Sequence, residues 1–216
     1  MMANMMDNMM NEMQRDLLKE YVNVFIGQAA SMLSEMANQH VLLSVSEIDL
    51  VNMLDERISD GKALFPHGYI VSSSMKFGHE FSGRALLLFP AKKAKLLVDA
   101  CMGVETVVKP DTPIDLRDDD FDVLKEISNV ILNSVVGEFS NLMGTTVEFS
   151  VPNVDLVFIS ENDQIQFLKN SVYMLMLHTH FMLAEDEVEG MVIIALGMNS
   201  LNKLLGKIDE VLGEIT

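Results

Sequence analysis

Two glutamate–asparagine pairs recur in the chain with the same spacing, Glu20 with Asn23 and Glu126 with Asn129. Residues three apart on a helix are neighbours, so each pair is expected to present its two side chains together. Asparagine is neither an acid–base catalyst nor a nucleophile, but its amide donates and accepts hydrogen bonds and can orient a water molecule. This suits hydrolysis whose electrophile and metal come from another molecule, because phosphoryl transfer depends mainly on positioning and charge stabilisation. The carboxylate one turn away could pair with a cation of that molecule and fix how it docks.

The two pairs belong to an internal repeat with a shift of 106 residues. When residues 16–52 are aligned with residues 122–158 without a gap, 13 of 37 positions are identical. Fainter similarity extends the repeats to approximately 15–105 and 114–214. We therefore expect residues 1–216 to form a single domain made of two fused copies of one unit, not two independent domains.

Each repeat is predicted to contain a long helix, three strands and a shorter helix. Apolar residues every three or four positions indicate the long helices, and runs rich in Val, Leu and Ile indicate the strands. In the first repeat the elements are expected over 15–37, 40–53, 68–77, 83–89 and 90–102. In the second they are expected over 118–143, 146–159, 171–182, 189–196 and from 199 onward. The predicted fold is α+β, with pseudo-twofold duplicated helix–three-strand–helix units forming a mostly antiparallel six-stranded sheet on which the long helices pack.

Opposite its apolar face, each long helix carries a stripe of polar and small residues. The first stripe holds Asp16, Glu20, Asn23, Gly27, Ser31 and Ser34. The second holds Asp122, Glu126, Asn129, Asn133, Gly137 and Ser140. An ordinary solvated helix face is one reading of such a stripe. The other is a docking face, because solvated faces usually carry long side chains, whereas glycine and serine leave the surface low enough for another protein to approach.

The pattern D-x3-E-x2-N, followed 23 residues later by proline, resembles the signature of the CheC-like chemotaxis phosphatases, the CheC/CheX/FliY group. The second repeat has the complete pattern: Asp122, Glu126, Asn129 and Pro152. The first repeat has Asp16, Glu20 and Asn23, with Ser46 at the position of the proline. The duplicated layout and the length are closest to CheC. The glycine often found before the asparagine is replaced by Val22 and Ser128.

This resemblance implies a hydrolase that removes the phosphoryl group from the phospho-aspartate of a CheY-type response regulator. Asn23 and Asn129 would orient water, and Glu20 and Glu126 would pair with the active-site lysine of the regulator. The Mg²⁺ would be held by the regulator, so no cofactor or metal is expected on this chain. The second site is favoured because its motif is complete.

Two questions about partners stay open at this stage. Many CheC proteins also bind the deamidase CheD, which makes CheD a second candidate partner, although no residue can be assigned to that contact. The alternative to catalysis is a noncatalytic signalling module that binds a response regulator or CheD. Both functions would use the same polar stripes, so binding alone does not distinguish them.

The overall charge excludes several kinds of partner. The chain has 15 Lys and Arg against 32 Asp and Glu, a formal net charge of −17. Nucleic-acid sites and anionic membrane surfaces both need clustered cations, so neither is an expected partner. Cys101 is the one cysteine and cannot form an internal disulfide; it is expected to be a small packed residue. With no predicted signal segment or membrane span, a cytoplasmic protein is expected.

Two further patterns are left with open interpretations. His178 and His180 lie two apart on a predicted strand, which can begin a metal site, but no third ligand is indicated by spacing and a structural role is favoured. Residues 1–13 are a Met-rich N-terminal extension, with 7 of the 18 methionines. They either extend the first helix and cover apolar surface or form a frayed tail.

Overall fold

The computed structural model describes residues 9–53, 67–104, 115–160, 172–183 and 186–215. Within them the order of elements is helix, three strands, helix, and then the same order again with one strand split. The first repeat contains α1 (Glu12–Ala37), β1 (Val41–Asn52), β2 (Gly68–His79), β3 (Gly83–Pro90) and α2 (Ala91–Met102). The second contains α3 (Asp118–Leu142), β4 (Val147–Phe149), β5 (Asn153–Ile159), β6 (Tyr173–Leu183), β7 (Asp186–Leu196) and α4 (Met198–Ile215). The predicted α+β fold is confirmed.

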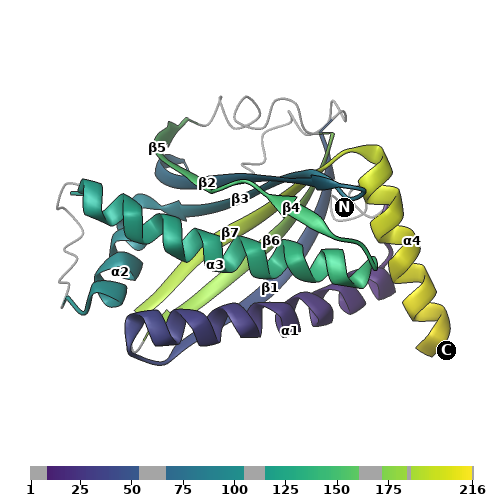
Figure 1. The fold of residues 1–216 in the computed structure, drawn as a ribbon, viewed down its shortest axis with the longest axis horizontal. Helices are drawn as coiled ribbons and strands as arrows, with labels where there is room; N and C mark the ends of the chain where they lie inside the picture. Colours follow the sequence, from purple (N-terminus) through teal and green to yellow (C-terminus); the bar gives the residue numbers. More distant parts are fainter. Residues whose placement is uncertain (1–8, 54–66, 105–114, 161–171, 184–185, 216) are drawn as a thin grey trace, which may run out of the picture.

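The strands of the two repeats interleave in one antiparallel sheet (Figure 1). The order is β1-β6-β7-β3-β2-β4, and β5 pairs with β2 beside β4. The first strand of each repeat therefore pairs with the second strand of the other repeat: β1 with β6, and β4 and β5 with β2. Neither repeat can form its part of the sheet alone, because its first strand would lose the one neighbour that it has among the described strands.

The two long helices lie side by side across one face of this sheet, and their apolar faces form the main core (Figure 1). Phe25 of α1 and Phe139 of α3 meet edge to face, with ring centroids 6.2 Å apart. The opposite face of the sheet carries a second, smaller apolar cluster. Its buried members are Val51, Ile70, Leu86, Leu88, Ile159, Met174, Met176, Met191 and Ile193.

The described residues form seven strands where six were expected, because the strand predicted over 146–159 is split into β4 and β5. Between the two segments, the three residues 150–152 face only Met75 and Lys76 of β2. Pro152 lies in this interruption and has no N–H to donate to a ladder. The first repeat has one extra residue at the equivalent place, since β1 bulges between Val45 and Glu47. There the strand continues past the bulge, so β1 is a single element.

The Met-rich segment is described only from residue 9, so most of it lies outside the described residues. Asn11 caps α1, accepting a hydrogen bond from the backbone N–H of Gln14 at 2.9 Å, so the helix begins at Glu12. Met10 precedes the helix and is buried in the main core, which supports the covering role at this position. In the described part of the chain, no helix is long and apolar enough to cross a membrane.

Candidate functional site

The two glutamate–asparagine pairs lie on different helices, one on α1 and one on α3. On α1, Glu20 is exposed and Asn23 is half-buried; on α3, Glu126 is exposed and Asn129 is half-buried. The helices place them there because their apolar faces are buried in the core. The structure therefore keeps the two pairs as separate candidate sites, and their surroundings differ.

In the first pair, the amide of Asn23 is used to hold the edge of the sheet. Asn23 Oδ1 accepts a hydrogen bond from the backbone N–H of Val45 at 2.8 Å. Asn23 Nδ2 donates to the carbonyl oxygens of Val45 at 3.2 Å and Lys19 at 3.0 Å. Both N–H groups of the amide are thus committed, because a carboxamide has only two. Val45 belongs to β1, the edge strand of the described sheet, where its outward N–H and C=O groups have no neighbouring strand within the described part of the chain.

Ser34, farther along the same stripe, does the same for the start of β1. Its hydroxyl oxygen accepts from the backbone N–H of Val41 at 3.0 Å and donates to the carbonyl of Ala30 at 2.7 Å. The polar stripe of α1 therefore serves the structure of the edge strand. Sequence reasoning missed this use, because it depends on β1 lying at an edge.

In the second pair, the amide of Asn129 is bound only to a neighbour on its own helix. Asn129 Oδ1 accepts a hydrogen bond from Asn133 Nδ2 at 2.9 Å. Its own NH₂ group has no hydrogen-bond partner among the described residues. Val151, which corresponds to Val45 in the repeat, is 71% exposed in the interruption between β4 and β5. Asn129 thus retains free hydrogen-bonding capacity that Asn23 has lost.

The residues that precede the two asparagines fix the helices against the sheet. Val22 and Ser128 are both buried. The Ser128 hydroxyl lies 2.6 Å from Ser73 Oγ on β2, an added polar link between α3 and the sheet. The side chains that replace glycine at these two positions are therefore accommodated in the contact between helix and sheet.

Ion pairs hold the start of the helix that carries the second motif. Lys95 of α2 lies 2.8 Å from Asp99 and 3.0 Å from the buried Asp120 in the first turn of α3. Burial opposes the charge on Lys95, but its hydrogen bonds to the two carboxylates outweigh this and raise its pKa. Asp120 also accepts from the backbone N–H of Arg117, which fixes where α3 begins. Asp122, the first residue of the motif, follows two positions later and is exposed.

A shallow hollow of about 420 Å³ continues the second stripe toward the C-terminal half of α3. Asn133, Gly137 and Ser140 line it on the helix, and Thr145 and Phe149 line it on the following segment. A β-carbon added at Gly137 would meet no atom within 4 Å, so the surface is open there. The low, polar surface inferred from the sequence is present at this stripe.

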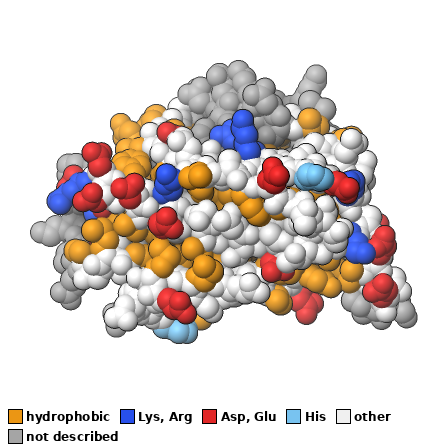
Figure 2. Space-filling model, viewed as in Figure 1, with side chains coloured by type: hydrophobic (Ala, Val, Ile, Leu, Met, Phe, Trp, Pro, Cys, Tyr) orange, Lys and Arg blue, Asp and Glu red, His pale blue; other side chains and the backbone are white. Residues whose placement is uncertain are grey.

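Exposed apolar side chains lie along the edge of the sheet near the second motif. Phe149, Val151 and Leu156 come from the β4–β5 edge, and Phe158 packs edge to face on Tyr69 with ring centroids 5.2 Å apart. Leu156 pairs with the core residue Val71 and Phe149 with the core residue Phe77, so these two side chains point to the face covered by the helices. Figure 2 shows apolar side chains over the β5 region next to the acidic start of α3.

The structure adds two ligand candidates that the spacing of His178 and His180 did not indicate. His178 Nε2 lies 3.2 Å from Asp49 Oδ2, and Glu47 is close enough to complete a group of three. His180 Nδ1 lies 3.0 Å from Glu187 Oε1, and its Nε2 lies 3.0 Å from Ser46 Oγ. One sequence signal was available: Glu47 and Asp49 alternate on one predicted strand, as the two histidines do on another. The pairing of these two strands with each other was not predictable.

Cys101 is a packed residue, as expected. It lies half-buried in α2 against the main core. Burial raises the pKa of its thiol to about 11, so the thiolate that a nucleophile needs is disfavoured at neutral pH.

Solved structures of the same fold include FliY, the FliM middle domain and the chemotaxis protein CheX. Thermotoga maritima FliY superposes with a TM-score of 0.74 at 17% identity, covering 93% of this chain and 98% of that one. The FliM middle domain from H. pylori gives 0.60 at 11% identity, covering 91% and 99%. CheX from Desulfovibrio desulfuricans gives 0.50 at 17% identity, covering 82% and 99%. Other FliM matches are complexes with SpeE and with FliG. No protein-family model matches the chain. The chain has the fold of the CheC/CheX/FliY fold family, and at these identities the likeness concerns the fold.

Proposed function

We propose that this chain, which has the fold shared by FliY, FliM and CheX, acts in chemotaxis signalling as a phosphatase for the phospho-aspartate of a CheY-type response regulator. Asn129 orients the attacking water, and Glu126 fixes the docked regulator. Asn23 and Glu20 belong to the matching motif, but Asn23 serves the edge of the sheet. The proposal thus assigns catalysis to the second motif.

The observation that carries this proposal is the difference between the two asparagine amides. Asn23 has both N–H groups committed to backbone carbonyls, whereas the NH₂ of Asn129 has no partner among the described residues. Asn129 also keeps the second lone pair of its carbonyl oxygen. A free donor and a free acceptor on one rigid helix can hold a water molecule in a fixed orientation.

The reaction needs little covalent chemistry from this chain. The oxygen of the held water attacks phosphorus, and the bond from phosphorus to the aspartyl oxygen breaks. The aspartate leaves as a carboxylate, and inorganic phosphate carries away the water oxygen and its protons. Positioning of the water supplies the catalytic effect. Charge neutralisation at the phosphoryl group comes from the Mg²⁺ expected on the regulator.

The surface around the second motif supports docking of a protein. Glu126 is exposed beside Asn129, and small residues form the hollow farther along the helix. The exposed Phe149 of β4 lines the same hollow. A charged contact beside an apolar one would fix both the affinity and the register of a bound regulator.

The test is the decay of a phosphorylated CheY-type regulator with Mg²⁺, measured with and without substoichiometric amounts of the full chain. We expect the chain to accelerate decay with turnover. Asn129→Ala is expected to remove about 100-fold of that acceleration, the usual scale for losing one group that positions a reacting atom. Asn23→Ala is the matched control and should retain most of it.

The noncatalytic alternative predicts a different result in the same assay. A signalling module would bind the regulator tightly at this surface without accelerating loss of phosphate. That outcome, or undiminished turnover in the Asn23→Ala, Asn129→Ala double variant, would contradict the mechanism. CheD binding would be measured separately, because no described residue is assigned to it.

A further inference from the structure

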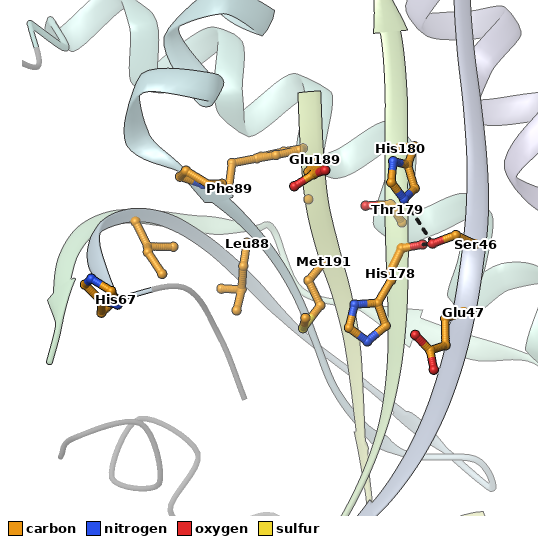
Figure 3. Close-up of a pocket in the computed structure, with 13 residues that line it drawn as sticks. Ser46, Glu47, His67, Leu88, Phe89, His178, Thr179, His180, Glu189 and Met191 are labelled. Atoms are coloured by element: carbon orange, nitrogen blue, oxygen red, sulfur yellow. Dashed lines mark hydrogen bonds between the residues drawn. The ribbon is translucent and has the colours of Figure 1, made fainter. Parts of the chain in front are cut away.

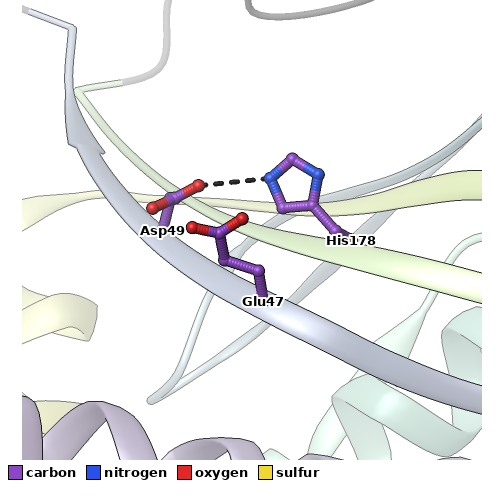
Figure 4. A group of neighbouring side chains, drawn as sticks. All are labelled: Glu47, Asp49 and His178. Atoms are coloured by element: carbon purple, nitrogen blue, oxygen red, sulfur yellow. Dashed lines mark hydrogen bonds and ion pairs between the residues drawn. The ribbon is translucent and has the colours of Figure 1, made fainter.

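Three potential metal ligands meet on the face of the sheet opposite the helices. Glu47 and Asp49 come from β1 and His178 from β6, and one ligand atom of each lies within 4.8 Å of the others (Figure 4). The bulge after Val45 makes this meeting possible, because it brings Glu47 directly opposite His178 in the register. Asp49 follows two residues later and so lies on the same face of the strand.

We propose that Glu47, Asp49 and His178 bind a divalent transition-metal ion of the Zn²⁺ class. This site is on other residues and another face than the proposed phosphatase site, and it does not depend on that function. One imidazole nitrogen and two carboxylates form a donor set that suits zinc, whereas Mg²⁺ and Ca²⁺ prefer oxygen ligands alone. With neutral His178, the three side chains carry two negative charges, which a divalent ion neutralises.

The spacing of the ligand atoms fits such an ion. Two ligands of a tetrahedral zinc site, each about 2.0–2.1 Å from the metal, lie about 3.3 Å apart. His178 Nε2 and Asp49 Oδ2 are already 3.2 Å apart. Glu47 is exposed, and its flexible side chain can bring its carboxylate to the third position. The hydrogen between His178 and Asp49 would be displaced, and the imidazole would carry its proton on Nδ1.

A hollow of about 480 Å³ opens beside the cluster (Figure 3). Glu47 and His178 line it together with Ser46, His180, Glu189 and Met191. It gives an ion a path from solvent and leaves room for a water molecule as the fourth ligand. His180 is held by Glu187 and Ser46, so we do not count it among the ligands.

An ion at this position would tie the edge strand β1 to β6. Because its ligands come from two strands that are distant in the sequence, the site exists only when the sheet is formed. Metal binding would then stabilise the folded protein, and the stabilisation would grow with the logarithm of the free-ion concentration once that exceeds the dissociation constant.

The test is titration of the chelator-treated full chain with Zn²⁺, with binding followed by calorimetry and by the unfolding temperature. We expect one ion per chain and an unfolding temperature that rises with Zn²⁺. Glu47→Gln should weaken binding at least about tenfold, since loss of a ligand costs no less than loss of a residue that supports one. Glu47 is exposed, so this variant is expected to fold normally. His79→Ala, which removes an exposed histidine outside the cluster, is the matched control and should bind as tightly as the unchanged chain.

A second measurement identifies the ligands themselves. Co²⁺ in place of Zn²⁺ should give a visible spectrum of nitrogen and oxygen coordination without a thiolate charge-transfer band, and Cys101→Ser should leave it unchanged. Absence of stoichiometric binding, or equal affinity in Glu47→Gln and the unchanged chain, would overturn the proposal. No regulator is present in these measurements, so their outcome is separate from that of the phosphatase assay.

Discussion

Asn23 and Val45 exchange two hydrogen bonds between α1 and the edge strand β1. The backbone N–H of Val45 donates to Asn23 Oδ1 at 2.8 Å, and Asn23 Nδ2 donates to the Val45 carbonyl at 3.2 Å. The carboxamide thus imitates the backbone of a neighbouring strand. In the second repeat, the equivalent Asn129 makes no such contact, and Val151 is exposed. One sequence motif therefore has a structural role in one half of the molecule and retains a free amide in the other.

The first prediction concerns the stability that this contact provides. Asn23→Ala leaves the N–H and C=O of the buried Val45 without their partner, which should lower the free energy of unfolding by about 1–3 kcal/mol. Asn129→Ala removes only the bond from Asn133 and should cost less. Urea unfolding of the two variants measures both values. Equal stability of Asn23→Ala and the unchanged chain would contradict the structural role.

Much of this fold could be predicted from local sequence patterns. The apolar spacing of the long helices and the Val-rich strands identified most elements, because each pattern is a property of one segment. The exchange of strands between the repeats was not predictable, since β1 and β6 are more than a hundred residues apart. The role of Asn23 follows from that exchange. It depends on β1 being an edge strand, and no local signal marks an edge.

Pro152 shows how a motif residue can be identified without its physical role being known. The sequence marked it only as part of a signature. In the structure it is buried in the interruption between β4 and β5, where the register with β2 stops at Phe149 and resumes at Asn153, with one backbone bond from Ser150 N–H to the Lys76 carbonyl between them. Ser46 at the equivalent place allows β1 to continue past its bulge, and Val45 there reaches Asn23. The repeat with the complete motif is thus also the repeat whose asparagine NH₂ group has no hydrogen-bond partner among the described residues.

A second prediction concerns the reactivity of Cys101. Because burial raises its pKa to about 11, the folded protein at pH 8 should be alkylated by iodoacetamide on the order of 100-fold more slowly than the urea-unfolded chain. The rate should rise with pH toward 11. Cys101 is the one cysteine of the chain, so mass spectrometry reports this site alone. Equal rates for folded and unfolded protein at pH 8 would refute the burial effect.

The same pKa fixes the sign of its effect on stability. The thiol is protonated in both states below the ordinary thiol pKa, so Cys101 contributes no pH dependence there. Between that pH and about 11, unfolding releases its proton, and the free energy of unfolding should fall as the pH rises. Cys101→Ser should remove this part of the decline, which urea unfolding at pH 8 and pH 10 would measure.

A third prediction separates the two motif carboxylates. Glu126→Gln should raise the KM for phosphorylated regulator about threefold to tenfold at low salt, because a charge that fixes docking is lost. The difference should shrink at high salt, where such contacts are screened. Glu20→Gln makes the same change on the helix whose asparagine is committed and should leave the KM unaltered. An equal effect of both substitutions would mean that Glu126 has no special place in docking.

A fourth prediction uses two glycines, one on the stripe of each long helix. Gly137 lines the hollow on α3, and Gly27 is exposed on α1; a β-carbon at either would meet no atom within 4 Å. Arginine at either position favours the helix over glycine, so both variants should fold at least as stably as the unchanged chain. Gly137→Arg places a long side chain where the regulator is proposed to approach. At subsaturating regulator it should slow dephosphorylation at least about tenfold, because a loss of about 1.4 kcal/mol of binding free energy is already a tenfold change in affinity. Gly27→Arg adds the same charge on the other helix and should retain the activity. Full activity of Gly137→Arg at low regulator concentration would place the docking surface away from the second stripe. The reason is that the arginine side chain would cover the lowest part of that stripe, where glycine leaves the helix backbone uncovered.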